Sequence, residues 1–336
     1  MGGLDLTSYL RTYVMLALAL VTIGCATVGP NSMSGGAAAA REQEYGLLTI
    51  DKDTVWFGRI RITGDVYVKE GATLTIQPGT VIRFDIIDPK LDKDGGRNMF
   101  RVEGGPYFPS AEIIVRGRLI AVGTKERPII FKSSGKGVRP GAWGAINLLG
   151  SNGNVVEYCR INDAYIGVHS HSSSVVVMNN EFSNNGTAVQ FNKEDFDNPC
   201  VMFIEHNTMT GNLSGISARN ATADIAYNDI SNNTFYGIWI KENTNMRVEY
   251  NNVTGNGKGI YLFKAPPTRI SHNNIFDNKE YNIEMAVDSP NDVDASDNWW
   301  STTEAMNISA TFYDKGADES LGKVIFEPVA AEAVRR

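Results

Sequence analysis

From about residue 150 the chain repeats one pattern of polar and apolar positions. Each repeat begins with an asparagine that is followed two positions later by an apolar residue. These asparagines are Asn180, Asn207, Asn228, Asn251, Asn273 and Asn298, which lie 27, 21, 23, 22 and 25 residues apart. A period near 22 residues, with several short alternating segments in each period, is typical of the turns of a parallel β-helix.

Two more columns of residues keep the same phase. A second asparagine follows in five repeats, at Asn185, Asn212, Asn233, Asn256 and Asn278. A small residue and an apolar residue then follow, as in Ala188-Val189, Gly215-Ile216, Gly237-Ile238 and Gly259-Ile260. Rungs stacked about 4.8 Å apart place like residues above one another. We therefore expect asparagine ladders at the bends, where this residue also tolerates left-handed backbone geometry.

The front half of the chain predicts similar rungs from a different sequence. Short alternating segments are separated by turn residues, as in Ile60/Ile62, Val66/Val68, Leu74/Ile76 and Ile82/Phe84. They are too short for helices and too close together for crossover connections. A leucine-rich repeat would need leucine at fixed offsets, and a propeller would need about 40–50 residues per blade.

The patterns together predict an all-β chain that folds as a single-stranded parallel β-helix. We expect it to span residues 45–328 in about ten or eleven rungs of roughly 22–25 residues each. Residues 86–110 break the rhythm and are expected to form an inserted loop. Residues 329–336 are expected to form a C-terminal tail.

The N-terminus carries an export signal. Arg11 precedes an apolar run from Val14 to Ile23, which is too short to span a bilayer but suits a signal peptide. Gly24-Cys25 at its end resembles a bacterial lipobox, although Thr22 stands where that motif usually has leucine. The resemblance implies removal of residues 1–24, a lipid anchor at Cys25, a flexible tether over 25–44 and location in the outer membrane of the cell envelope. The alternative is an ordinary signal peptide with an incidental cysteine.

Composition narrows the classes of partner. The chain has 31 Lys and Arg against 38 Asp and Glu, a formal net charge of -7, which argues against nucleic acid as a partner. Three cysteines exclude a disulfide-dense scaffold, and four histidines leave little material for a multi-histidine metal centre.

Several motifs resemble bacterial right-handed parallel β-helix repeat proteins. The opening motifs are Gly64-Asp65-Val66, Gly71-Ala72-Thr73-Leu74-Thr75-Ile76 and Pro78-Gly79-Thr80, and the closing ones are Asn298-Trp299-Trp300 and Phe326-Glu327-Pro328. Ser301 replaces the glycine that usually follows the tryptophans. The likeness covers about residues 45–328 and extends to pectate-lyase-like enzymes and to β-helices of the carbohydrate-binding and sugar-hydrolase type. It implies a right-handed β-helix and leaves the function open.

The strand after each small–apolar pair is the expected binding face, because in pectate-lyase-like β-helices that strand lines the substrate cleft. Side chains alternate in and out along a strand, so two columns face outward. The residues we expect to bind a ligand there are Trp239, Tyr261, Phe263, Arg219, Lys241, His169, Gln190 and Asn192. Aromatic rings pack on sugar C–H surfaces, and cations grip acidic sugars. The alternative is that these aromatic residues merely suit β structure or contact a loop.

Candidates for chemistry are few. Arg219 and Glu284 are the catalytic candidates on this face, and no second carboxylate is placed for paired acid and base work. Glu194, Asp195 and Asp197 form an acidic stretch that could hold Ca²⁺, or simply a solvated loop. His169 and His171 alternate on one strand and could chelate a metal together. No other cofactor is expected.

Two functions stay open at this stage. The first is a non-catalytic envelope lipoprotein whose β-helix presents a binding face for a glycan or another surface component. The second is a polysaccharide lyase or hydrolase that acts on an acidic glycan along the same face.

Overall fold

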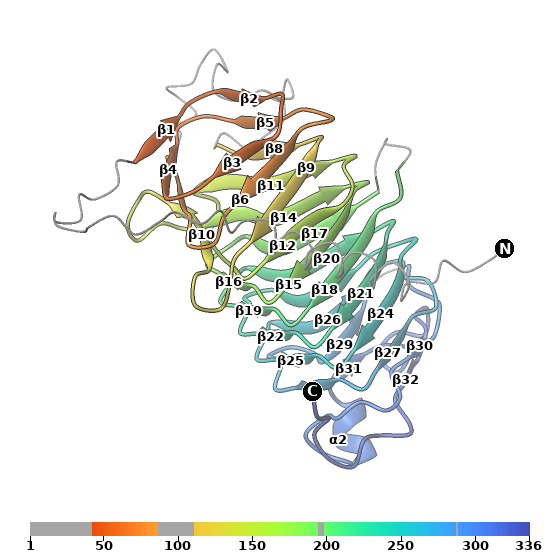
Figure 1. Ribbon diagram of the computed structural model, residues 1–336. Coiled ribbons are helices and arrows are strands. Elements are labelled where there is room, and N and C mark those ends of the chain that lie inside the picture. The colour runs from red at the N-terminus through yellow and green to blue at the C-terminus, as the bar shows by residue number, and fades with distance from the viewer. Residues whose placement is uncertain (1–41, 87–110, 194–197, 287) are drawn as a thin grey trace. The chain divides into compact units, whose positions relative to one another are not determined.

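The computed structural model describes residues 42–86, 111–193, 198–286 and 288–336. Over these residues the chain coils through three parallel sheets, here called A, B and C, and each rung contributes one strand to each sheet (Figure 1). The predicted signal peptide, Cys25, most of the tether and the predicted loop from residue 87 onward lie outside the described residues.

The strands follow the same order in every rung. Sheet A contains β1 (Gln43–Tyr45), β4 (Arg59–Ile62), β7 (Val81–Phe84), β10 (Ile129–Ser133), β13 (Cys159–Asn162), β16 (Glu181–Ser183), β19 (Thr208–Thr210), β22 (Asp229–Ser231), β25 (Asn252–Thr254) and β28 (Asn274–Phe276). Sheet B contains β2 (Leu48–Ile50), β5 (Val66–Val68), β8 (Ile113–Val115), β11 (Trp143–Leu149), β14 (Ala164–His171), β17 (Thr187–Asn192), β20 (Ser214–Arg219), β23 (Tyr236–Ile240), β26 (Lys258–Leu262), β29 (Ile283–Met285) and β31 (Phe312–Tyr313). Sheet C contains β3 (Thr54–Trp56), β6 (Thr73–Ile76), β9 (Arg118–Val122), β12 (Asn154–Glu157), β15 (Ser174–Met178), β18 (Val201–Glu205), β21 (Thr222–Ala226), β24 (Asn245–Glu249), β27 (Arg269–Ser271), β30 (Val293–Asp294) and β32 (Val324–Ile325).

The rung count agrees with the prediction. In the described part of the chain, sheet A has 10 strands and sheets B and C have 11 each, which makes ten complete rungs and a partial eleventh. The predicted parallel β-helix is therefore confirmed. Along the described residues, no helix is long and apolar enough to cross a lipid bilayer.

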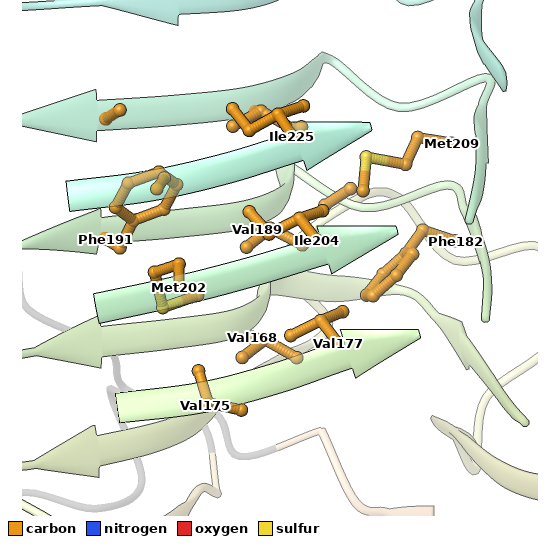
Figure 2. Packing of buried hydrophobic residues seen from close by; sticks show 14 of the residues in the cluster. Val168, Val175, Val177, Phe182, Val189, Phe191, Met202, Ile204, Met209 and Ile225 are labelled. Atoms are coloured by element: carbon orange, nitrogen blue, oxygen red, sulfur yellow. The ribbon is translucent and has the colours of Figure 1, made fainter. Parts of the chain in front are cut away.

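The core is a column of apolar side chains between the three sheets. Each strand buries alternate residues, and the register stacks like residues on like. The inward column of sheet B contains Val168, Val189, Ile216, Ile238, Ile260 and Ile283, all fully buried. Figure 2 shows part of the core around Val168, Val177, Phe182, Val189, Ile204 and Met209. Each such side chain contributes about 1.5–3 kcal/mol when fully buried.

The predicted asparagine ladders are confirmed. Asn207 donates from its backbone N–H and from Nδ2 to Asn228 Oδ1, at 2.9 and 3.0 Å. Its Nδ2 also donates to Val177 O at 2.8 Å. A second ladder repeats these contacts at Asn185, Asn212, Asn233, Asn256 and Asn278. The buried amides thus satisfy backbone groups of two neighbouring rungs, which would otherwise be left without partners.

One detail of the expectation was wrong. The left-handed residue at these bends is the one before each ladder asparagine, for example His206 with φ 55° and Tyr227 with φ 58°. The ladder asparagines contribute through side-chain hydrogen bonds instead of through a tolerated backbone conformation. On four successive rungs the left-handed residues are aromatic and stack at centroid distances of 5.0, 5.0 and 5.3 Å, in the order His206, Tyr227, Tyr250, His272. Because two tyrosines lie between them, His206 and His272 cannot share an ion.

The last rungs carry the remaining features. The short helix α2 (Ala305–Ser309) and the C-terminus lie there (Figure 1). The C-terminal residues return along sheet A: Val334 N–H donates to Asn274 Oδ1 at 2.7 Å, and Arg336 forms an ion pair with Asp229 at 2.8 Å. Cys159 and Cys200 are free and buried, and burial raises the pKa of both thiols. Both cysteines therefore act as small packing residues with little thiolate character.

Candidate functional site

The register of sheet B aligns one outward residue from each rung, from Thr49 to Tyr313. The seven residues of this line on β11 to β29 are here called the outer column: Asn147, His169, Gln190, Ser217, Trp239, Tyr261 and Glu284. Six of them are the column expected from the repeat, and Asn147 lies on the rung before them. The small–apolar pair thus predicted correctly where this strand lies in each repeat and which of its side chains point outward.

The second expected column is only partly a ladder. His171 pairs with Asn192 and Asn192 with Arg219. Lys241 and Phe263 follow the ends of β23 and β26, where their backbone N–H groups still donate to the preceding rung, at 2.9 Å each. Arg219 is exposed, whereas Lys241 and Phe263 are half-buried.

Three aromatic rings meet on β23 and β26, and we call them the aromatic cluster: Tyr236, Trp239 and Tyr261. The ring centroids of Trp239 and Tyr261 lie 5.8 Å apart, and Tyr236 lies 5.1 and 5.0 Å from them. All three are half-buried, so each keeps part of its surface accessible. Among the described residues, no ring contact joins Phe263 to this cluster. Tyr236 was missed because it precedes the glycine of the repeat, although its type and its place three residues before Trp239 could have pointed to it.

A pair of cations borders the aromatic cluster. Lys241 Nζ lies 3.7 Å from the ring centroid of Trp239. Burial, and then the charge of Arg219, lower the pKa of Lys241. Arg219 forms an ion pair with Glu242 at 2.7 Å, and no carboxylate of the described residues forms an ion pair with Lys241. Trp239 Nε1 and Glu242 Oε2 are buried with no hydrogen-bond partner in the described part of the chain.

The two catalytic candidates lie apart. Arg219 ends β20 and Glu284 lies on β29, three rungs further along, which is about 14 Å at the usual strand spacing. Glu284 instead accepts from Lys258 Nζ at 2.8 Å. Burial disfavours the charge of Lys258, but the hydrogen bond and charge of Glu284 outweigh it and raise the pKa of Lys258. The structure therefore does not bring Arg219 and Glu284 together.

His169 and His171 form a buried pair. His169 Nδ1 and His171 Nε2 lie 3.2 Å apart, and Gln190 Nε2 lies 3.3 Å from His169 Nε2. Burial, and then the nearness of His171, lower the pKa of His169 well below its ordinary value, so this imidazole is neutral. Within the described ranges, no three His, Cys, Asp or Glu side chains lie close enough to hold a metal ion. The acidic residues Glu194, Asp195 and Asp197 lie outside the described residues.

A buried carboxyl group on the same face was also missed. Glu112 immediately precedes β8, is 4% exposed, and accepts from Asn147 Nδ2 at 3.1 Å. Burial raises the pKa of Glu112 to about 8, the hydrogen bond from Asn147 opposes the rise, and the charge of Asp65 adds to it. The front half of the chain lacks the asparagine repeat, so no repeated column indicated which way this residue faces.

Comparison with known families now becomes informative. Residues 144–298 match the model of the right-handed beta helix region, and residues 48–157 match that of the pectate-lyase like beta helix domain. This chain is a right-handed parallel β-helix protein. Both matches fall within the three-sheet coil, and together they cover all of its complete rungs except the two ends.

Solved structures resemble this right-handed β-helix protein at low sequence identity. The A-module of the Azotobacter vinelandii mannuronan C-5 epimerase AlgE6 is 10% identical, with 76% of this chain and 75% of that chain covered and a TM-score of 0.43. The periplasmic alginate epimerase AlgG is 14% identical, with 86% of this chain and 74% of that chain covered and a TM-score of 0.46. No curated protein matches the sequence.

Proposed function

We propose that the protein binds an acidic carbohydrate through the outer face of sheet B. It does so without catalysis, as a lipid-anchored protein of the bacterial cell envelope. The observation that carries this proposal is the aromatic cluster, with Lys241 Nζ 3.7 Å from the ring centroid of Trp239.

The aromatic cluster supplies the apolar part of the binding surface. Half-buried rings keep a fixed orientation and lose little entropy when a ligand packs against them. Aromatic side chains also dominate the energetics of binding surfaces, since they offer a large contact area together with a polar edge. A sugar ring with its C–H groups toward Tyr236 or Tyr261 would use this area.

The charges beside the cluster favour an acidic sugar. At the Trp239 end of the cluster, Arg219 and Lys241 carry two positive charges against the single negative charge of Glu242. At the Tyr261 end, Lys258 is paired with Glu280 and Glu284, so the surplus of positive charge is confined to the Trp239 end. Lys241, which no carboxylate of the described residues pairs, offers donors to the carboxylate of an acidic sugar.

Binding of acidic glycans by variants tests the proposal. We expect the purified protein to bind uronate oligomers, and Trp239→Ala to weaken binding at least tenfold, about 1.4 kcal/mol, because a central aromatic contact is lost. Phe57→Ala is the matched control, since Phe57 is 59% exposed and follows β3 of sheet C. Equal affinity of the wild type and both variants would remove this surface as the binding site.

An enzyme that acts on an acidic glycan is the second candidate. The observation that favours it is the presence of two groups with shifted pKa values, Glu112 and His169, on the binding face, since such shifts gather at catalytic sites. Incubation with uronate polymers and Ca²⁺ distinguishes the two candidates. Unsaturated products or new reducing ends would replace the binding proposal with a lyase or a hydrolase.

The envelope location rests on the Gly24-Cys25 motif. We expect mass spectrometry of the protein from bacterial membranes to find a lipid on Cys25 as the first residue of the mature chain. Cys25→Ser should release the protein from the membrane fraction. A Cys25→Ser variant that stays in the membrane fraction would contradict the anchor. So would a mature chain that begins at an unmodified residue other than Cys25.

A further inference from the structure

Glu112 and Asn147 hold two buried oxygens that lack a donor. Asn147 Nδ2 donates to Glu112 Oε2 at 3.1 Å. In the part of the chain that the structure describes, the other oxygens of the same two side chains, Glu112 Oε1 and Asn147 Oδ1, are buried with no hydrogen-bond partner. Each such orphaned acceptor costs about 1–3 kcal/mol in a protein interior. The pair is therefore short of one hydrogen-bond donor.

The backbone is shaped around this carboxyl group. A Cβ atom at Gly144 would lie 2.3 Å from Glu112 Cγ and 2.7 Å from Oε1, so the glycine leaves the space in which the side chain lies. Gly144 N–H also donates to Ala111 O at 3.0 Å, which ties β11 to the residue before Glu112. The position of the carboxyl group is thus fixed by two neighbouring rungs.

The charged and titratable neighbours of Glu112 disfavour a negative charge there. Asp65, fully buried before β5, accepts from the backbone N–H of Glu112 at 3.1 Å. Tyr67 of β5 lies beside β8 in the register, and His169, a neutral imidazole, follows Asn147 in the outer column. No Lys or Arg of the described residues forms an ion pair with Glu112. Among the described residues, a carboxylate at Glu112 would therefore be buried beside a second carboxyl group with no cation paired to it.

We propose that Glu112 and Asn147 form a proton-binding switch in sheet B, in which a neutral carboxylic acid pairs with the amide and loss of the proton opens this part of the sheet. A proton on Oε1 supplies the donor that Asn147 Oδ1 lacks, and it needs no space for a further atom. The pKa of Glu112, raised to about 8 chiefly by burial, agrees with a neutral acid at neutral pH.

Loss of the proton has a local consequence. The charged Glu112 must gain water or move away from Asp65, and either response disturbs the hydrogen bonds between β8 and β11. The switch therefore controls the N-terminal half of the sheet B face, separately from the aromatic cluster. It does not depend on which ligand that cluster binds.

Glu112→Gln tests the switch because glutamine reproduces the protonated pair. Its amide can donate to Asn147 Oδ1 and accept from Asn147 Nδ2 at any pH. Hydrogen exchange of peptides that cover β8 and β11 should be compared from about pH 5 to about pH 9, after correction for intrinsic rates. We expect exchange in the wild type to rise at least tenfold relative to Glu112→Gln as the pH increases. Glu70→Gln, at an exposed glutamate, should follow the wild type.

A second measurement uses the unaltered protein. The infrared band of a protonated carboxyl group should be present in the wild type at pH 7, absent in Glu112→Gln, and lost from the wild type as the pH approaches 9. A pH-independent difference in exchange, or a wild type without that band at pH 7, would overturn the proposal.

Discussion

Single residues hold this fold together through hydrogen bonds that run along its axis. Asn228 shows the pattern: its Oδ1 accepts twice from Asn207, at 2.9 and 3.0 Å, and its Nδ2 donates to Ile204 O and Ala226 O at 2.8 and 3.0 Å. Because the site is fully buried, water cannot replace these contacts. One side chain therefore satisfies groups of several rungs at once.

Asn228→Ala should destabilise the protein strongly. The change removes the acceptor of the buried Asn207 N–H and the side-chain donor to Ile204 O and Ala226 O, so we expect a loss of about 3 kcal/mol in the free energy of unfolding. Asn252→Ala is the control, because Asn252 lies on the outer face of sheet A and is half-buried. Urea unfolding should give a change below about 1 kcal/mol for the control. Equal losses of unfolding free energy in both variants would show that the ladder asparagines contribute no more to stability than an asparagine on the outer face.

Lys241→Met should weaken binding of an acidic glycan without changing stability. The unpaired charge beside Trp239 is removed while the apolar stem is kept, so we expect roughly tenfold lower affinity at low salt and a smaller difference at high salt. Lys264→Met is the control, since Lys264 also contacts an aromatic ring but forms an ion pair with Asp288 at 3.4 Å. An affinity loss that is the same at low and high salt concentration would contradict an electrostatic role for Lys241. A loss equal to that of Lys264→Met would contradict it as well.

The sequence located some of these residues and not others. Trp239, Tyr261 and the ladder asparagines recur at a fixed phase, so their facing followed from the period. Glu112 lies where the repeat is absent, and its burial depends on neighbours from other rungs. Only three-dimensional packing could reveal that this glutamate has no basic partner among the described residues.

The strands of sheet B depend on small residues at one position of each rung. A Cβ atom at Gly237 would lie 2.6 Å from Gly259 O and 2.9 Å from Asn256 Nδ2. Neither neighbour can move without disturbing the second asparagine ladder. The glycine of the small–apolar pair is thus required by the close approach of successive rungs, and its φ is not left-handed.

Gly237→Ala should therefore destabilise the protein by about 1–3 kcal/mol through overpacking. Gly46→Ala is the matched control, because the nearest atom to its added Cβ is Thr63 Oγ1 at 3.7 Å and its φ is also not left-handed. Thermal unfolding of the two variants checks the expectation. A Gly237→Ala variant as stable as Gly46→Ala would show that the rungs can separate at no cost.

The prediction of elements was accurate where the repeat is regular. The phase of the Gly–Ile pair gave the register of β20, β23 and β26. Between the longer strands β11 and β14 the register shifts at Ala145 and Ile146. No sequence motif predicts this irregularity. Close to the shift in the chain, Trp143 of β11 stacks on Phe84 of β7 at a centroid distance of 4.0 Å.

At the scale of the whole molecule, the fold is a scaffold that repeats one face many times. The parallel β-helix could be predicted from the period, because each rung must bury its apolar residues against the next, and its right-handedness from the resemblance to known β-helix repeat proteins. The function could not be predicted from the fold, because stacking requires apolar inward residues on every rung and leaves the outward residues free to vary. In the proposed function, the ligand contacts outward residues of sheet B, above all Trp239 with Lys241.

The most direct test of this account is hydrogen exchange of the full-length protein with and without a saturating uronate oligomer. We expect slower exchange in the peptides that cover β20, β23 and β26, which bear Arg219, Trp239 and Tyr261, and unchanged exchange in the strands of sheets A and C. Protection confined to another sheet, or no protection by any acidic glycan, would contradict the proposal that this face binds carbohydrate.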